Sequence, residues 1–101
     1  MIYGVVSVRV KPGKKEEYIA LFKTMAARVR AEKGCLEYIS TVDFKAGPPI
    51  QVFEENVVTI LEKWESLDAL QAHLAAPYMA DFFQKEGALI EGNVLKFLRE
   101  A

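Results

Sequence analysis

Residues 60–83, ILEKWESLDALQAHLAAPYMADFF, pass from a strand pattern into two helix starts. Ser66 is a good N-cap for the first helix, since its hydroxyl can accept a backbone N–H of the first turn. Pro77 suits the first position of a second helix, where no intrahelical N–H bond is lost. We therefore predict a strand, a short helix and a further helix that ends at Gly87, and the short helix would bury Leu67, Leu70 and Leu74.

The same stretch carries the side chains best suited to chemistry. Glu62 and Trp64 are two residues apart, which places them on one face of the predicted strand. His73, the only histidine, lies on the short helix, and Tyr78 follows Pro77. A carboxylate, an indole, an imidazole and a phenol thus fall within one strand-helix-helix unit, where we expect any active site to lie.

The flanking segments alternate between strand and helix patterns. Val and Ile dominate the first strand, whose residues Ile2 to Val10 place every second side chain on a common face. A helix follows from Lys14 to Glu32, with apolar residues at helical spacing, and Gly34 ends it. The remaining predicted elements are strands over Cys35 to Asp43, Asn56 to Glu65 and Ala88 to Arg99, and a loop over Phe44 to Asn56 that contains a short strand at Ile50 to Phe53.

The order of these elements is β-α-β-β-α-β, the ferredoxin-like pattern. We predict an α+β fold with a four-stranded antiparallel sheet and helices on one face only. The other face would expose many Val, Ile and Leu side chains, and a large bare apolar face normally marks an interface. Two such sheets packed face to face would form a homodimer with two-fold symmetry.

Composition bounds the class of protein. The 101 residues, 51% hydrophobic and 27% charged, fit one globular domain over residues 1–101. A net charge of −1 with interspersed signs argues against nucleic-acid binding and against attraction to an anionic membrane. The chain has one cysteine, Cys35, which allows no internal disulfide. No apolar run reaches the length of a membrane span, and the first residues do not have the form of a signal peptide. We expect a cytoplasmic protein.

Four blocks in order along the chain resemble the antibiotic biosynthesis monooxygenase family. They are Val10-Lys11-Pro12-Gly13-Lys14, Glu32-Lys33-Gly34-Cys35-Leu36-Glu37-Tyr38, Glu62-Lys63-Trp64-Glu65-Ser66 and Ala72-His73-Leu74-Ala75-Ala76-Pro77-Tyr78. The resemblance covers essentially the whole chain and implies a dimeric α+β barrel with one pocket per subunit. Several members oxygenate anthrones or quinols without metal, flavin or nicotinamide, whereas others degrade haem and one isomerises a phosphorylated signalling molecule.

The sequence departs from the family pattern in three places. Tyr78 stands where the family often has a second histidine, and Ile60 lies nearest to the position where some anthrone-oxidising members carry asparagine. The loop from Phe44 to Asn56 is longer than is common. It would either cover the pocket or extend the dimer contact.

His73 is the first candidate for catalysis. Oxygenation without a cofactor needs a proton removed from a phenol or quinol, and imidazole groups exchange protons near neutral pH. The alternative is a structural histidine that caps its helix or binds a neighbouring strand. Glu62, on a strand face that meets the helices, would either orient His73 or form a salt bridge with a lysine or arginine.

Aromatic residues supply the predicted substrate-binding groups. Trp64 would form a wall against which a planar substrate stacks, or else a core residue. The hydroxyl groups of Tyr38 and Tyr78 would hold a substrate oxygen, although each is also explained as an ordinary strand or helix-start tyrosine. Phe22 and Phe82 would pack between helix and sheet and form the floor of the cavity.

The leading hypothesis is a cofactor-independent monooxygenase that acts on a small aromatic phenol, quinol or anthrone with O2. His73 and Trp64 would be its catalytic residues, and Tyr38, Glu62, Tyr78, Phe82 and Phe22 would bind substrate. No metal site is predicted, because one histidine and one cysteine far apart make no ligand cluster, and no nucleotide-binding motif occurs. The alternatives are a haem-degrading enzyme that uses His73 as ligand, an isomerase of a small hydroxyketone, and a dimeric ligand-binding domain without catalysis.

Overall fold

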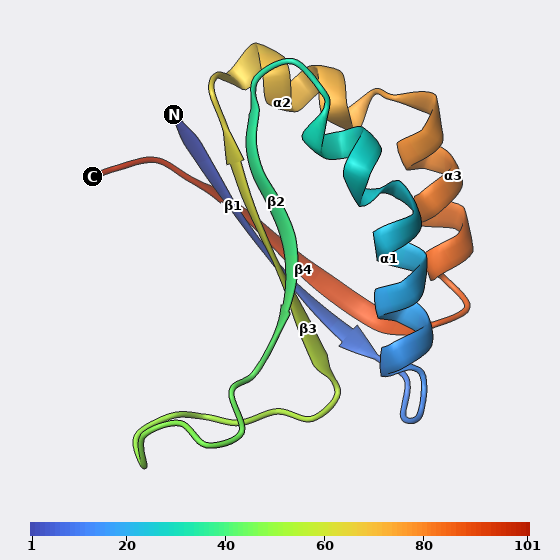
Figure 1. The fold of residues 1–101 in the computed structure, drawn as a ribbon, viewed down its shortest axis with the longest axis vertical. Coiled ribbons are helices and arrows are strands. Elements are labelled where there is room, and N and C mark those ends of the chain that lie inside the picture. Colours follow the sequence, from blue (N-terminus) through green and yellow to red (C-terminus); the bar gives the residue numbers. More distant parts are fainter.

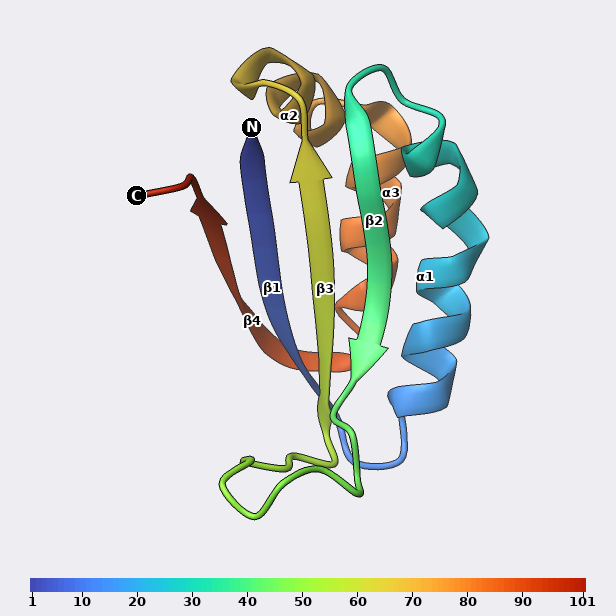
Figure 2. The same ribbon diagram turned by 60° about the vertical axis from the view of Figure 1, so that its left-hand side comes forward.

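A computed structural model describes residues 1–101 and confirms the ferredoxin-like arrangement (Figure 1). The elements are β1 (Ile2–Val10), α1 (Lys15–Arg30), β2 (Cys35–Val42), β3 (Val57–Trp64), α2 (Leu67–Leu74), α3 (Pro77–Glu86) and β4 (Ile90–Leu98). The four strands form one antiparallel sheet in the order β2-β3-β1-β4. All helices lie on one face of this sheet, as Figures 1 and 2 show from two sides.

The predicted strand faces of β1 and β3 are confirmed. Val6, Val8 and Val10 are buried under the helices, and their register partners on β3 include Ile60 and Val58. Helix α1 packs onto this layer with Tyr18, Phe22, Met25, Ala26 and Val29. Each large side chain buried in this way contributes about 1.5–3 kcal/mol, so the layer between sheet and helices holds the fold together.

The turn after α1 requires a glycine. Gly34 has a φ of +84°, and a Cβ there would lie 2.5 Å from the Cβ of Ala69 on α2. This close approach brings the end of α1 against the start of α2. Ser66 caps α2 as predicted, because its Oγ accepts the backbone N–H of Ala69 at 3.2 Å.

Three predictions about local structure differ from the structure. Residues 50–53 form no strand, and the chain from 43 to 56 is an irregular loop that projects past the sheet on the side away from the helices (Figure 1). Strand β4 begins at Ile90 rather than at the predicted Ala88, and a bulge between Arg9 and Val10 places Ile90 rather than Glu91 opposite Val10. Helix α2 buries Leu70 and His73, whereas Leu67 and Leu74 remain half exposed, so its buried face is not the predicted leucine stripe.

No helix is both long enough and apolar enough to span a lipid bilayer.

Candidate active site

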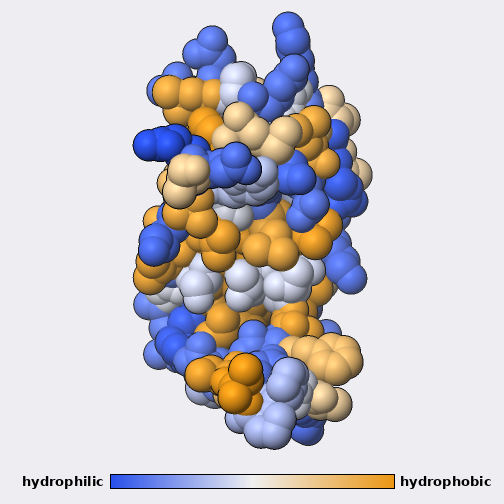
Figure 3. All heavy atoms as spheres, turned by 90° about the vertical axis from the view of Figure 1, so that its left-hand side faces the viewer, coloured by the Kyte–Doolittle hydropathy of each residue, from blue (hydrophilic) through white to orange (hydrophobic).

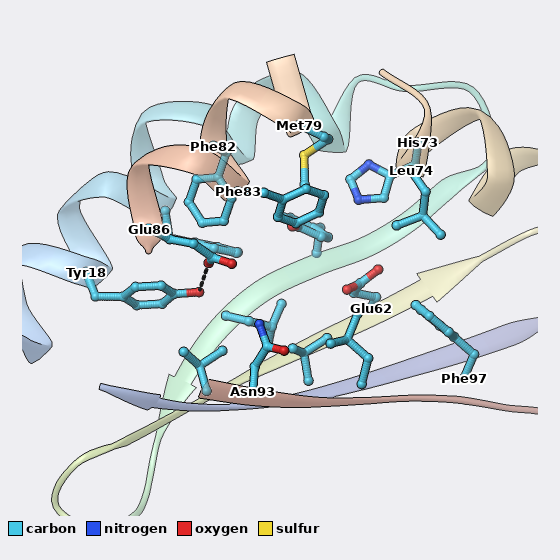
Figure 4. A pocket seen from close by; sticks show the side chains of 16 residues that line it. Tyr18, Glu62, His73, Leu74, Met79, Phe82, Phe83, Glu86, Asn93 and Phe97 are labelled. Carbon is cyan, nitrogen blue, oxygen red and sulfur yellow. Dashed lines mark hydrogen bonds between the residues drawn. The ribbon is translucent and has the colours of Figure 1, made fainter. Parts of the chain in front are cut away.

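A cavity lies between the helix-covered face of the sheet and helices α2 and α3 (Figure 4). Its free volume is about 40 Å³ and 12 of its 16 lining residues are hydrophobic. A water molecule needs roughly 10–15 Å³, so the cavity has room for water, whereas a cavity that binds benzene is about 150 Å³. The four other lining residues are Glu62, His73, Glu86 and Asn93.

His73 reaches the cavity from the last turn of α2 and is 1% exposed. Its Nδ1 lies 3.0 Å from Oε2 of Glu32, which follows the end of α1. The hydroxyl of Tyr78, at the start of α3, donates to the same oxygen. Because a carboxylate oxygen can only accept hydrogen bonds, the Nδ1–H of His73 is the donor in its contact with Glu32, and Nε2 is the ring nitrogen not engaged by Glu32.

The Nε2 atom of His73 faces the cavity. It has no hydrogen-bond partner within the protein. Every side-chain nitrogen or oxygen that is fully enclosed in this protein does have a partner, so Nε2 is not fully enclosed. It is therefore in contact with accessible space, and the space that His73 lines is the cavity. A lone pair on a buried imidazole, with a carboxylate behind the ring, is the arrangement of a general base.

Glu62 and Trp64 form a second pair beside the histidine. The indole Nε1 of Trp64 donates to Oε1 of Glu62 at 2.9 Å, since residues two apart on β3 share a face. Burial raises the pKa of Glu62, and the Trp64 hydrogen bond and the nearby His73 offset this only in part. The Trp64 ring centroid lies 4.7 Å from that of His73, so the indole supports both the carboxyl and the imidazole.

Tyr38, from β2, lines the cavity beside His73, with ring centroids 5.4 Å apart. Its ring stacks on Phe22 with centroids 5.1 Å apart, and its hydroxyl has no partner within the protein although the residue is buried. Burial, followed by the nearby Glu62, raises the pKa of this phenol above the ordinary value. The hydroxyl therefore stays protonated and can donate a hydrogen bond into the cavity.

The structure brings together five of the seven residues predicted for the site. His73, Glu62, Tyr38, Phe22 and Phe82 all line the cavity. The other two do not: Trp64 is fully buried behind Glu62 and His73, and Tyr78 packs under the Arg28 guanidinium, 4.0 Å from its ring centroid. The predictions that Trp64 forms a wall of the pocket and that Tyr78 contacts a ligand there are therefore wrong. Other side chains lie between these two residues and the cavity.

The predicted partners of Glu62 also need correction. No lysine or arginine forms a salt bridge with Glu62, and the partner of the His73 Nδ1 is Glu32 instead. Burial favours the protonated form of the Glu62 carboxyl, which needs no neutralising cation, and the Trp64 indole N–H supplies one hydrogen bond to it.

Sequence reasoning missed four polar residues of the site, Glu32, Tyr18, Glu86 and Asn93. Glu32 lies 41 positions from His73, at a helix end whose spacing gives no sign of a contact with α2. Glu86 and Tyr18 line the far end of the cavity. A signal for Glu86 was present, since it continues the buried spacing of Met79 and Phe82 on α3.

No three or more His, Cys, Asp or Glu side chains gather where they could hold a metal ion. Haem is far larger than a single aromatic ring, so a cavity with a free volume of about 40 Å³ would have to open much further for haem than for a phenol. The geometry gives the haem alternative no support.

Comparisons with known proteins identify one family model, a related sequence and solved structures of the same fold. The family model described as "Antibiotic biosynthesis monooxygenase" matches residues 1–85. The probable quinol monooxygenase YgiN of Escherichia coli is 30% identical over 97 residues, which cover 93% of each chain. A crystal structure of a protein from Shewanella oneidensis is 27% identical with a TM-score of 0.84, over 98% of this chain and 89% of that one. A protein from Methanosarcina mazei shares the fold at 21% identity, with a TM-score of 0.85 over 99% of this chain and 92% of that one.

Proposed function

Because the chain belongs to the antibiotic biosynthesis monooxygenase family, we propose that it oxidises a small aromatic phenol, quinol or anthrone with O2 and without a bound cofactor. One observation carries this proposal. A buried histidine is held by a carboxylate through Nδ1 and directs Nε2 into a mostly hydrophobic cavity. The similarity to a probable quinol monooxygenase points to the same substrate class.

The reaction begins with proton transfer from a substrate hydroxyl to Nε2 of His73. Glu32, 3.0 Å from Nδ1, stabilises the imidazolium that forms. The electron-rich substrate anion then gives one electron to O2, and the two radicals combine through a new carbon–oxygen bond. Loss of water from the hydroperoxide leaves a carbonyl. For a quinol, one molecule of hydroquinone and one of O2 thus give one molecule of hydroxybenzoquinone and one of water, and the substrate supplies all the electrons.

The remaining cavity residues position the substrate. The Tyr38 hydroxyl can donate to the substrate oxygen that becomes negative, which stabilises the anion in a site of low polarity. Phe22 and Phe82 offer aromatic faces to a planar ring. Trp64 acts as a positioning residue through its bond to Glu62.

Substrate entry requires movement at the mouth. A ring needs more space than the cavity has, since about 150 Å³ accommodates benzene. Four apolar side chains that line the cavity are also 38–45% exposed, so they form its outer rim: Leu74, Phe83, Leu95 and Phe97. Rotation of exposed side chains is fast, on the picosecond to nanosecond scale, and these four are the side chains whose rotation would admit a ring.

The uncovered face of the sheet is the proposed contact with a second copy of the chain. It displays apolar side chains among polar ones (Figure 3), with Ile39 40% and Val94 62% exposed near the half-buried Val5 and Leu61. Face-to-face packing of two identical sheets buries this surface symmetrically. Sedimentation velocity should show a dimer that Val94→Glu converts to a monomer, whereas Leu67→Glu, at a 55% exposed position on α2, should leave it intact.

Oxygen uptake tests the proposed activity. The purified protein is offered dihydroxy-aromatics and anthrones, with catalase and superoxide dismutase present to suppress autoxidation. We expect uptake that depends on the protein and is lost in both His73→Ala and His73→Gln. Tight binding without uptake would indicate a ligand-binding domain, and a Soret band on adding haem that His73→Ala abolishes would indicate a haem enzyme.

A further inference from the structure

A second polar pair lies at the opposite end of the cavity from His73 (Figure 4). Tyr18, from α1, donates through its hydroxyl to Oε2 of Glu86, at the end of α3, over 3.4 Å. The two residues are 1% and 6% exposed, and both line the cavity. The reaction proposed above uses neither of them.

The Glu86 carboxyl has hydrogen-bonding capacity left over. Only its Oε2 has a partner, and Oε1 accepts from no group of the protein. Since no enclosed side-chain oxygen is left without a partner, Oε1 is in contact with accessible space, and Figure 4 shows the carboxyl directed into the cavity. No lysine, arginine or histidine forms a salt bridge with Glu86.

Such a group is unusual in a cavity that serves only to bury a hydrocarbon. A buried polar atom without a partner costs free energy, and burial accordingly raises the pKa of Glu86. Tyr18 fixes the orientation of the carboxyl but leaves one oxygen available. A ligand hydroxyl at that oxygen would complete its hydrogen bonding.

We propose that Glu86, held in place by Tyr18, binds a second hydroxyl of the substrate, at the end remote from His73. The cavity then recognises an aromatic diol at both ends: one hydroxyl lies at His73 Nε2 and the other at Glu86 Oε1. Monohydric phenols of the same size leave the Glu86 oxygen unpaired and bind less tightly. This inference rests on the proposed function for the class of substrate, and Glu86 is a specificity-determining residue for that class.

The test measures binding without turnover. Hydroquinone and 4-methylphenol differ by a hydroxyl against a methyl group of similar size, so they isolate the hydrogen bond at one end. Calorimetric titration without O2 keeps hydroquinone reduced, and the outcome does not depend on whether the protein oxygenates anything. We expect wild-type protein to bind hydroquinone about tenfold more tightly than 4-methylphenol.

Two variants locate the discrimination. The double variant Tyr18→Phe/Glu86→Leu removes both partners and leaves no orphaned hydroxyl, so it should fold and lose the preference, with affinities that differ by less than about twofold. Glu86→Gln keeps one oxygen to accept from Tyr18 and presents an amide N–H that can donate to the ligand hydroxyl, so it should keep most of the preference. Circular dichroism establishes that each variant is folded before titration.

Several results would overturn this inference. Equal affinity of wild-type protein for the two ligands would do so, as would failure of folded wild-type protein to bind hydroquinone. A preference that survives in the double variant would place the second hydroxyl elsewhere. The anaerobic titration separates the two proposals. A preference for hydroquinone without oxygen uptake would support the Glu86 subsite and contradict the monooxygenase activity. Oxygen uptake without a preference for hydroquinone would support the activity and contradict the subsite.

Discussion

Replacement of Glu32 by glutamine tests the proposed role of the carboxylate behind His73. Glutamine keeps the size of the side chain and one acceptor oxygen, but it removes the negative charge that lies 3.0 Å from Nδ1. A hydrogen bond to a charged group is worth about 1.5–3 kcal/mol and a neutral one about 0.5–1.5 kcal/mol. The difference of about 1–1.5 kcal/mol acts on the imidazolium formed during proton transfer.

We therefore expect Glu32→Gln to lower kcat about five- to tenfold, because each 1.36 kcal/mol corresponds to about a factor of ten in rate. KM should change little, since Glu32 does not line the cavity. A fall in kcat with KM unaltered distinguishes this role of Glu32 from a purely structural one.

Tyr78→Phe is the matched control for this variant. It removes the other donor to the same Glu32 oxygen and leaves the His73 contact and the ring packed under Arg28. We expect kcat within about twofold of wild type, as fits the loss of a hydrogen bond remote from the reacting atoms. Steady-state kinetics that gave Glu32→Gln the wild-type kcat, or gave Tyr78→Phe the larger loss, would refute the proposed role of Glu32.

Two further predictions concern the floor and the far end of the cavity. Gly4→Ala would place a Cβ 3.1 Å from both Glu62 Cβ and Phe97 Cε1, so we expect about 1–3 kcal/mol of destabilisation in urea unfolding and weaker substrate binding. Gly92→Ala is the control, because no atom lies within 4 Å of the added Cβ, and it should leave stability and binding unchanged. Equal effects of the two substitutions would show that crowding at Gly4 is not the cause. Burial raises the pKa of Glu86, so the folded protein keeps this carboxyl protonated at pH values where the unfolded chain has released the proton. The free energy of unfolding should therefore fall as pH rises above about 4.3, until the carboxyl of the folded protein also ionises. Thermal melts across this pH range should show a smaller fall for Glu86→Gln than for wild type, and identical falls would contradict the assignment.

Local patterns sufficed for much of the fold. The alternation in β1 and β3 identified the faces that carry Val6, Val8 and Glu62, and Ser66 located the start of α2. These features depend on neighbours within a few positions of the chain, which is the range over which periodicity and capping act. The irregular loop at 43–56 was placed correctly, although the strand expected inside it is absent.

The site required contacts that no local pattern encodes. His73 could be selected from the sequence because it is the only imidazole, but its partner Glu32 is brought to it by the packing of the α1 end against α2. Trp64 was placed on the correct strand face, yet adjacent layers of side chains separate it from the cavity. Which members of an apolar layer border a cavity depends on their volumes and on the crossing of helices over the sheet, and the sequence shows neither directly.

The central claim is that His73 starts the transfer of one oxygen atom from O2 to an aromatic substrate. Mass spectrometry after turnover under 18O2 tests it most directly, with a substrate taken from the oxygen-uptake panel. The account predicts one labelled oxygen in the product and one in water, with neither formed by His73→Gln. A product that is oxidised but unlabelled, with the label recovered as hydrogen peroxide, would contradict it, as would wild-type incorporation by His73→Gln.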